Sequence, residues 1–88
     1  MAFEVLLYPS ASKKLEKMDN SLRERYLKAL GKLEREDARF RHLKQGLPYF
    51  VDEIGGGRVV FEEDKTKKTR SVLFVGNHDE YQEWYSSV

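Results

Sequence analysis

The chain has 88 residues, of which 40% are apolar and 12% aromatic, enough for one packed domain and too few for two. Its 16 basic and 15 acidic residues leave a net charge of +1, which excludes a protein that binds nucleic acid through a strong overall positive field. The absence of cysteine excludes disulfides, thiolate metal sites and cysteine nucleophiles.

The first half of the chain predicts a strand followed by two helices. Residues 3–8 are β-prone and apolar on both parities, as in a strand that is covered on both faces. A short helix follows and ends before Asp19. A second, amphipathic helix begins at a capping box of Ser21 and Glu24 and runs to about Glu36. The two helices form a hairpin whose apolar stripes require a sheet to cover them.

The second half predicts three strands and a closing helix. Residues 49–54, 58–63 and 70–75 have the composition of strands, and short turns join them into an antiparallel meander. Aromatic residues at spacings of three and four predict a short helix within residues 79–88. We therefore expect one α+β domain over residues 1–88, in which a helical hairpin packs on one face of a four-stranded, mostly antiparallel sheet.

The chain carries no signal for export or for a membrane. Its first residues lack the basic and apolar regions of a signal peptide. No apolar run approaches the roughly 20 residues that span a bilayer. We therefore expect a cytoplasmic protein that does not contact a membrane.

Four stretches, in order and over nearly the whole chain, resemble the RelE/ParE toxin superfamily. They are residues 8–18, residues 43–47, the strand Arg58-Val59-Val60-Phe61-Glu62, which is similar to the family's YRVIYE strand, and residues 72–78 in the place of its VLAVGHR segment. The resemblance implies the fold predicted above. It also implies an antitoxin partner, whose extended segment wraps the toxin.

Two different activities are known in this superfamily. RelE-type members cut messenger RNA in the decoding site of the ribosome, whereas ParE-type members bind DNA gyrase and are not nucleases. For a RelE-type chain the resemblance implies cleavage without a metal or other cofactor, by attack of the ribose 2′-hydroxyl on the adjacent phosphate. Such a reaction needs a base, an acid and a cation for the charge of the phosphorane.

Three residues are the candidates for this chemistry. Arg58 matches the family arginine that is believed to contact phosphate, and its planar fork suits phosphate oxygens. His78 lies where some nuclease members carry a histidine, a side chain suited to acid–base work near neutral pH. Tyr81 lies where the family often places an aromatic residue that stacks on a base or shares in proton transfer. Each residue also has a structural interpretation. Arg58 can be a surface arginine after a glycine turn, and His78 can cap the C-terminal helix. Tyr81 can pack that helix against the sheet.

Further residues are candidates for binding RNA. Tyr85 can stack on a base, or it can pack the C-terminal helix on the sheet. For Trp84 we expect the packing role. Arg41, Lys44 and Arg70 can hold phosphates, and each is otherwise an ordinary surface charge.

The strand at residues 49–54 departs from the RelE pattern. RelE-type nucleases commonly place lysines or arginines there, one of them proposed as the general base, whereas this chain has Asp52 and Glu53. The departure and the low net charge favour a second hypothesis, a non-catalytic protein of the same fold that binds DNA gyrase or only an antitoxin. His78 and Tyr81 favour the first, a toxin of a toxin–antitoxin system that cleaves messenger RNA on the ribosome.

Overall fold

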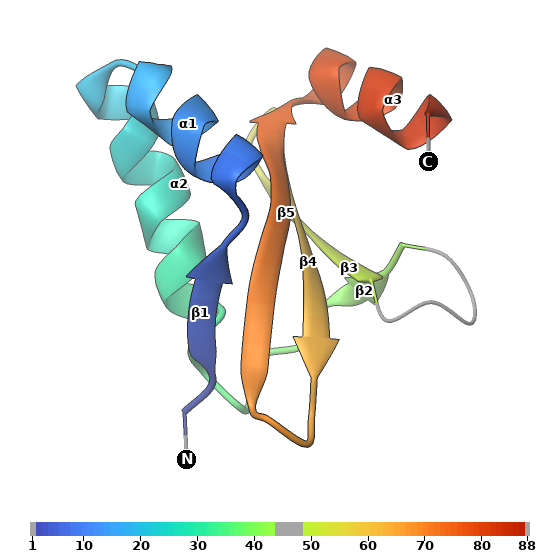
Figure 1. Cartoon of the computed structure of the whole chain (residues 1–88). Coiled ribbons are helices and arrows are strands. Elements are labelled where there is room, and N and C mark those ends of the chain that lie inside the picture. Colours follow the sequence, from blue (N-terminus) through green and yellow to red (C-terminus); the bar gives the residue numbers. More distant parts are fainter. Residues whose placement is uncertain (1, 44–48, 88) are drawn as a thin grey trace.

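The computed structural model describes residues 2–43 and 49–87, which form a five-stranded sheet with two helices on one face and a third at its end (Figure 1). The elements are β1 (Glu4–Leu7), α1 (Pro9–Lys17), α2 (Asn20–Lys32), β2 (Arg41–His42), β3 (Tyr49–Ile54), β4 (Gly57–Asp64), β5 (Thr69–Asn77) and α3 (His78–Ser86). The strand order is β1-β5-β4-β3-β2, with β1 parallel to β5 and the other neighbours antiparallel. The α+β class and the helical hairpin on a mostly antiparallel sheet are therefore confirmed.

The sheet has one strand more than the four that the sequence predicts. The additional strand, β2, is only two residues long and pairs Arg41 with Val51 and His42 with Phe50 at the edge of β3. Arg41 and His42 are too few to show the alternation of polar and apolar residues by which a strand is recognised in a sequence. Their pairing depends on β3, which offers them a free edge.

The predicted limits of α2 are wrong at both ends. Its cap is Asp19, whose carboxylate accepts a hydrogen bond from the N–H of Leu22 at 2.9 Å, and not the box that begins at Ser21. The helix ends at Lys32 rather than near Glu36. The next residue, Leu33, is fully buried in the core, so the chain turns to follow the core instead of continuing the helix.

Two apolar clusters, one on each face of the sheet, hold the elements together. The larger lies between the sheet and the helices α1 and α2 and contains Ala11, Leu15, Tyr26, Ala29, Leu30, Leu33, Val59, Phe61, Val72 and Val75. The smaller contains Val51, Val60 and Phe74, against which Leu43, Leu73, Tyr81 and Trp84 pack. The tail helix α3 thus lies on the face that α1 and α2 leave open, and its Trp84 packs on Phe74 as predicted.

A bulge in β5 contributes to this second cluster. The register of β4 and β5 shifts between Val60, which pairs with Phe74, and Phe61, which pairs with Val72. Leu73 is the extra residue, and it packs against the same cluster as Phe74.

No helix in residues 2–43 and 49–87 is long and apolar enough to cross a membrane.

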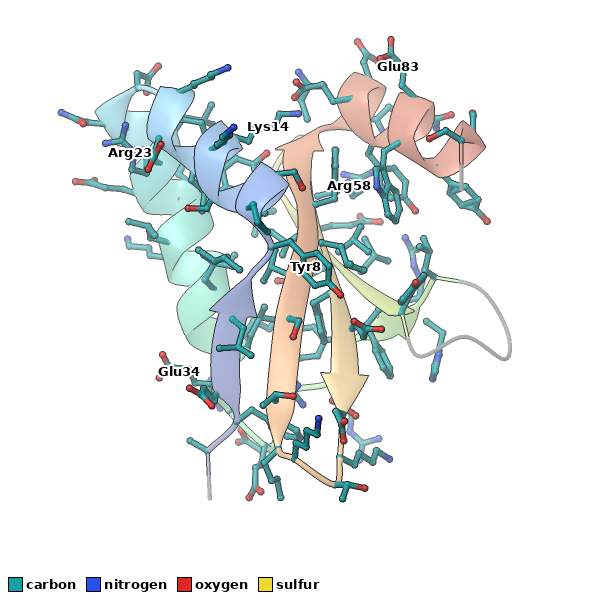
Figure 2. All side chains as sticks on the ribbon, viewed as in Figure 1. Tyr8, Lys14, Arg23, Glu34, Arg58 and Glu83 are labelled. Atoms are coloured by element: carbon teal, nitrogen blue, oxygen red, sulfur yellow. The ribbon has the colours of Figure 1, made fainter. Side chains whose placement is uncertain are left out.

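Arg23 joins the two helices of the hairpin (Figure 2). Its guanidinium donates hydrogen bonds to three carbonyl oxygens at the end of α1, those of Leu15 at 2.9 Å, Glu16 at 2.9 Å and Met18 at 2.7 Å. The last carbonyl groups of a helix have no partner within the helix, so a cation that binds them stabilises its end.

We expect Arg23→Ala to lower the free energy of unfolding by about 1–3 kcal/mol, because it removes hydrogen bonds from a charged donor. Urea denaturation measures the effect. Arg25→Ala, two residues further along the same helix, is the control, and equal losses in the two variants would contradict this role of Arg23.

Candidate functional site

The end of the sheet next to α3 brings the three candidate catalytic residues together. Arg58 of β4 pairs with Gly76 of β5, and His78 follows two residues later as the first residue of α3. Nη2 of Arg58 lies 3.2 Å from Nδ1 of His78. The guanidinium lies 5.8 Å from the ring centre of Tyr81. Figure 2 shows Arg58 in the space between the sheet and α3. The catalytic roles of these residues stay a prediction, but their side chains form one cluster.

The ring of His78 lies between two nitrogen donors. Arg58 faces Nδ1, and the amide nitrogen of Gln82 lies 3.3 Å from Nε2. A guanidinium can only donate, so a hydrogen bond from Arg58 is compatible only with a ring whose Nδ1 carries no proton. In that tautomer Nδ1 is a potential proton acceptor.

Tyr81 lies between Arg58 and the other aromatic residues of α3. Its ring centre is 6.3 Å from that of Trp84 and 5.8 Å from that of Tyr85, which meets it edge to face. Burial raises the pKa of the Tyr81 hydroxyl, and Tyr85 adds to the rise, while Arg41 and Arg58 oppose it. At neutral pH the hydroxyl is therefore protonated and can donate a proton or a hydrogen bond.

A carboxylate lies among the cations of this cluster. Glu53 pairs with Arg58 across β3 and β4. Its Oε1 is 2.7 Å from Nη2 of Arg41 and 3.8 Å from Nε of Arg58. Sequence reasoning treated Glu53 only as a departure from the family pattern and missed its place in the site. A two-residue turn at 55–56 places residue 53 opposite residue 58, and this spacing is the signal that locates it.

The neighbouring acid, Asp52, does not belong to the cluster. Its residue is 8% exposed, and its Oδ1 accepts a hydrogen bond from Nζ of Lys32 on α2 at 3.2 Å. Successive residues of a strand point to opposite faces, so Asp52 faces the helices while Glu53 faces the site.

Tyr26 of α2 fixes the strand ends that carry the site. Its buried hydroxyl donates a hydrogen bond to the carbonyl oxygen of Gly76 at 2.7 Å, and burial raises its pKa, so the donor keeps its proton. A Cβ atom on Gly57 would lie 2.2 Å from this hydroxyl, so only glycine fits at that position. The backbone N–H of His78 also donates to the carbonyl oxygen of Gly56 at 2.9 Å. These contacts hold the two chain segments from which the site side chains extend.

A capping box and an ion pair fix the start of α3. The side chain of Asn77 accepts from the N–H of Glu80 at 2.8 Å, and the carboxylate of Glu80 accepts from the N–H of Asn77 at 2.9 Å. Lys14 of α1 lies 2.7 Å from the other oxygen of Glu80. The hydrogen bond from Lys14 is the main reason why the pKa of Glu80 is lowered, with the N–H of Asn77 second.

Arg70 lies elsewhere, in the interior near the other end of β5. The residue is 4% exposed and donates to the carbonyl oxygens of Leu33 at 2.8 Å and Arg35 at 2.9 Å. It pairs with Glu63 at 2.9 Å, and its guanidinium lies 3.8 Å from the ring centre of Phe3. Its burial argues against the RNA contact expected from the sequence, and we assign it a structural role.

The other predicted RNA contacts divide into two groups. Arg41 and Tyr85 lie at the cluster, through Glu53 and Tyr81 respectively. Lys44 lies outside the described residues. The binding of RNA by these side chains stays a prediction.

Comparison with known proteins identifies the fold. A double mutant of the Escherichia coli toxin RelE in the free state is similar with a TM-score of 0.78 and 25% identity, over 98% of this chain and 93% of that chain. The toxin–antitoxin complex RelBE2 from Mycobacterium tuberculosis is similar with a TM-score of 0.77 and 22% identity, over 89% and 100%. The archaeal RelE–RelB complex from Pyrococcus horikoshii OT3 is similar with a TM-score of 0.69 and 19% identity, over 88% and 96%. No family model matches the sequence, and neither does any curated protein. The chain therefore has the RelE toxin fold, as the resemblance implied.

We expect Tyr26→Phe to lower the free energy of unfolding by about 1–3 kcal/mol, because it removes a buried hydrogen bond to the carbonyl oxygen of Gly76. Urea denaturation measures the loss. Tyr8→Phe is the control, because it removes an exposed hydroxyl that bonds to Glu62 and should change stability little. A Tyr26→Phe protein as stable as the control would contradict the role of this hydroxyl.

We expect Glu80→Gln to destabilise the protein at pH 7 and to have a smaller effect at pH 3. Because the pKa of Glu80 is lowered by folding, its ionised form stabilises the folded state above the ordinary glutamate pKa of about 4.3, and this contribution is lost as the pH falls through the lowered value. Urea denaturation at the two pH values measures it. Glu83→Gln, on the outer side of α3 in Figure 2, is the control. A loss for Glu80→Gln that is as large at pH 3 as at pH 7 would refute the linkage.

Proposed function

We propose that this chain is the toxin of a toxin–antitoxin pair and that it cleaves messenger RNA on the ribosome. The observation that carries the proposal is the contact of Arg58 with Nδ1 of His78, with Tyr81 beside the guanidinium. A cation, a proton acceptor and a protonated hydroxyl are the groups that attack by a ribose 2′-hydroxyl requires.

Arg58 is the proposed phosphate ligand. Its side chain is only 14% exposed, and Nη1 donates to the carbonyl oxygen of Gly57 at 3.0 Å, so the guanidinium is held in place before a substrate arrives. A planar guanidinium can bind two phosphate oxygens at once. Its charge then stabilises the phosphorane without reorganisation during the reaction.

His78 and Tyr81 are the proposed groups for proton transfer. When Nη2 of Arg58 leaves Nδ1 of His78 for a phosphate oxygen, Nδ1 takes the proton of the 2′-hydroxyl as the 2′-oxygen attacks phosphorus. The bond to the 5′-oxygen then breaks, and the Tyr81 hydroxyl donates a proton to that leaving oxygen. The products are a 2′,3′-cyclic phosphate and a 5′-hydroxyl end. Positioning of the messenger by the ribosome supplies the rest of the rate enhancement.

An antitoxin is the proposed protein partner. In solved structures from Mycobacterium tuberculosis, Pyrococcus horikoshii and Escherichia coli, toxins similar to this chain are bound to RelB-type partners. A toxin of this kind acts in the cytoplasm, where ribosomes and its antitoxin are present.

A second function is favoured by Glu53. Its carboxylate contacts Arg41 and lies close to Arg58, so it repels a phosphate from the cations that the nuclease needs. On this reading the chain is a non-catalytic member of the fold that binds DNA gyrase or only an antitoxin.

We expect Arg58→Ala and His78→Ala each to slow cleavage of ribosome-bound messenger by about 10²–10³-fold, because each removes one group that acts on the reacting atoms. Primer extension on a short messenger in a reconstituted translation system measures the rate. Arg35→Ala is the matched control, since that exposed arginine pairs with Asp37 away from the cluster and should leave the rate unchanged.

Two results would contradict the nuclease. In one, the wild-type protein leaves the messenger intact. In the other, Arg58→Ala and His78→Ala cut as fast as Arg35→Ala. A DNA gyrase supercoiling assay then tests the second function.

A further inference from the structure

A hollow of about 700 Å³ lies at the other end of β4 and β5 from Arg58. Its walls are Phe3, the segment 36–42 and the turn between β4 and β5. Among its lining residues are Arg39, Phe40, His42, Phe50, Lys65 and Lys68. None of these residues belongs to the Arg58 cluster.

The acids of the hollow are already paired. Glu63 lies 2.9 Å from Arg70, and both side chains are almost fully buried. Glu36 forms a hydrogen-bonded ion pair with Lys68, which holds the pKa of Glu36 well below its ordinary value. These pairs contribute no net charge, so the field of the hollow comes from its other cations.

Arg39 and Lys65 supply that field. Both line the hollow, and neither forms an ion pair with any residue in the described part of the chain. Both residues are exposed, and they come from different parts of the chain, the segment before β2 and the turn after β4. The hollow therefore offers two cations to an anionic ligand.

The hollow also presents a rigid aromatic surface. The exposed ring of His42 lies on Phe50 with their centres 4.2 Å apart, and Phe50 stacks on the buried Phe61 at 5.6 Å and 15°. Phe40 meets Phe61 edge to face at 4.9 Å. A stack that is anchored in the core leaves one ring, His42, free to receive a further planar group.

We propose that this hollow binds a nucleotide of single-stranded RNA, with its base on His42 and its phosphates at Arg39 and Lys65. Aromatic rings combined with unpaired cations are the surface that holds single strands, because every base has a face that stacks and every nucleotide has a phosphate. The volume is also of the size that holds a small ligand.

The two residues of β2 connect the hollow to the Arg58 cluster. Arg41 pairs with Glu53 at the cluster, and the next residue, His42, lines the hollow on the opposite face. The cluster and the hollow are therefore reached from adjacent residues on opposite faces of one edge strand. The inference rests on the proposed function in one respect, that RNA is the substrate.

The test measures binding of a ten-nucleotide 2′-O-methyl RNA, which cannot be cleaved, without ribosomes and at several salt concentrations. We expect the double variant Arg39→Ala/Lys65→Ala to bind at least about tenfold more weakly and to reduce the slope of log K against log salt by about 1.4, the value for two lost phosphate contacts to a single strand. His42→Ala should weaken binding by about tenfold with a slope closer to that of the wild type, because it removes the stacking ring and leaves Arg39 and Lys65 in place. Lys13→Ala/Lys17→Ala removes the same charge from exposed positions of α1 and is the matched control.

Three results would overturn the proposal. The first is an equal slope for the double variant and its control. The second is equally tight binding of an RNA hairpin duplex, which would assign the hollow to helical RNA. The third is displacement of the RNA by an acidic peptide at lower concentration than by a second RNA strand, which would assign it to a protein partner. A wild-type protein that binds RNA through Arg39 and Lys65 but cuts no messenger would refute the nuclease and leave the hollow standing.

Discussion

The hydrogen bond from the Tyr26 hydroxyl to the Gly76 carbonyl is the contact on which the site depends. It brings α2 so close to the ends of β4 and β5 that residue 57 must be glycine. Arg58 follows this glycine, and His78 lies two residues beyond Gly76, so the packing of a helix on a sheet sets the distance between them. Side chains that extend from strands and the first turn of a helix are held more rigidly than side chains on a loop. The site thus inherits its geometry from the core of the protein.

The elements of the fold were predictable where a sequence pattern extends over many residues. The β-prone runs of β3, β4 and β5 and the apolar stripe of α2 extend over enough residues to identify each element. The features that sequence reasoning missed are short or depend on distant parts of the chain. The strand β2 exists because β3 has a free edge. The end of α2 is set by the burial of Leu33. The sequence of the helix does not predict this burial.

The candidate site was predictable in part, for a related reason. Arg58 and His78 could be selected by residue type and family position, since each carries a chemistry that few other residues offer. Glu53 required the register of a turn, which becomes informative only once the turn is known to contain two residues. Arg70 could not be assigned, because an arginine in a basic run is normally exposed. It is buried here because Glu63 and the carbonyl oxygens of a distant segment complete its hydrogen bonds.

The near-neutral charge of the chain is compatible with a phosphate site because of how its ion pairs are exposed. At the cluster the guanidinium of Arg58 is 14% exposed, whereas the carboxylate of Glu53 is 47% exposed and is shared with an even more exposed Arg41. An exposed ion pair contributes about 1 kcal/mol or less, while a phosphate that binds a guanidinium through two oxygens forms a stronger, directional contact. Release of Glu53 into water therefore costs little, and Arg58 stays where the backbone of Gly57 holds it. Glu53, the acid that makes the sequence look unsuited to RNA, is the more exposed member of its pair with Arg58. Under the proposed function, a phosphate would replace this carboxylate at the guanidinium.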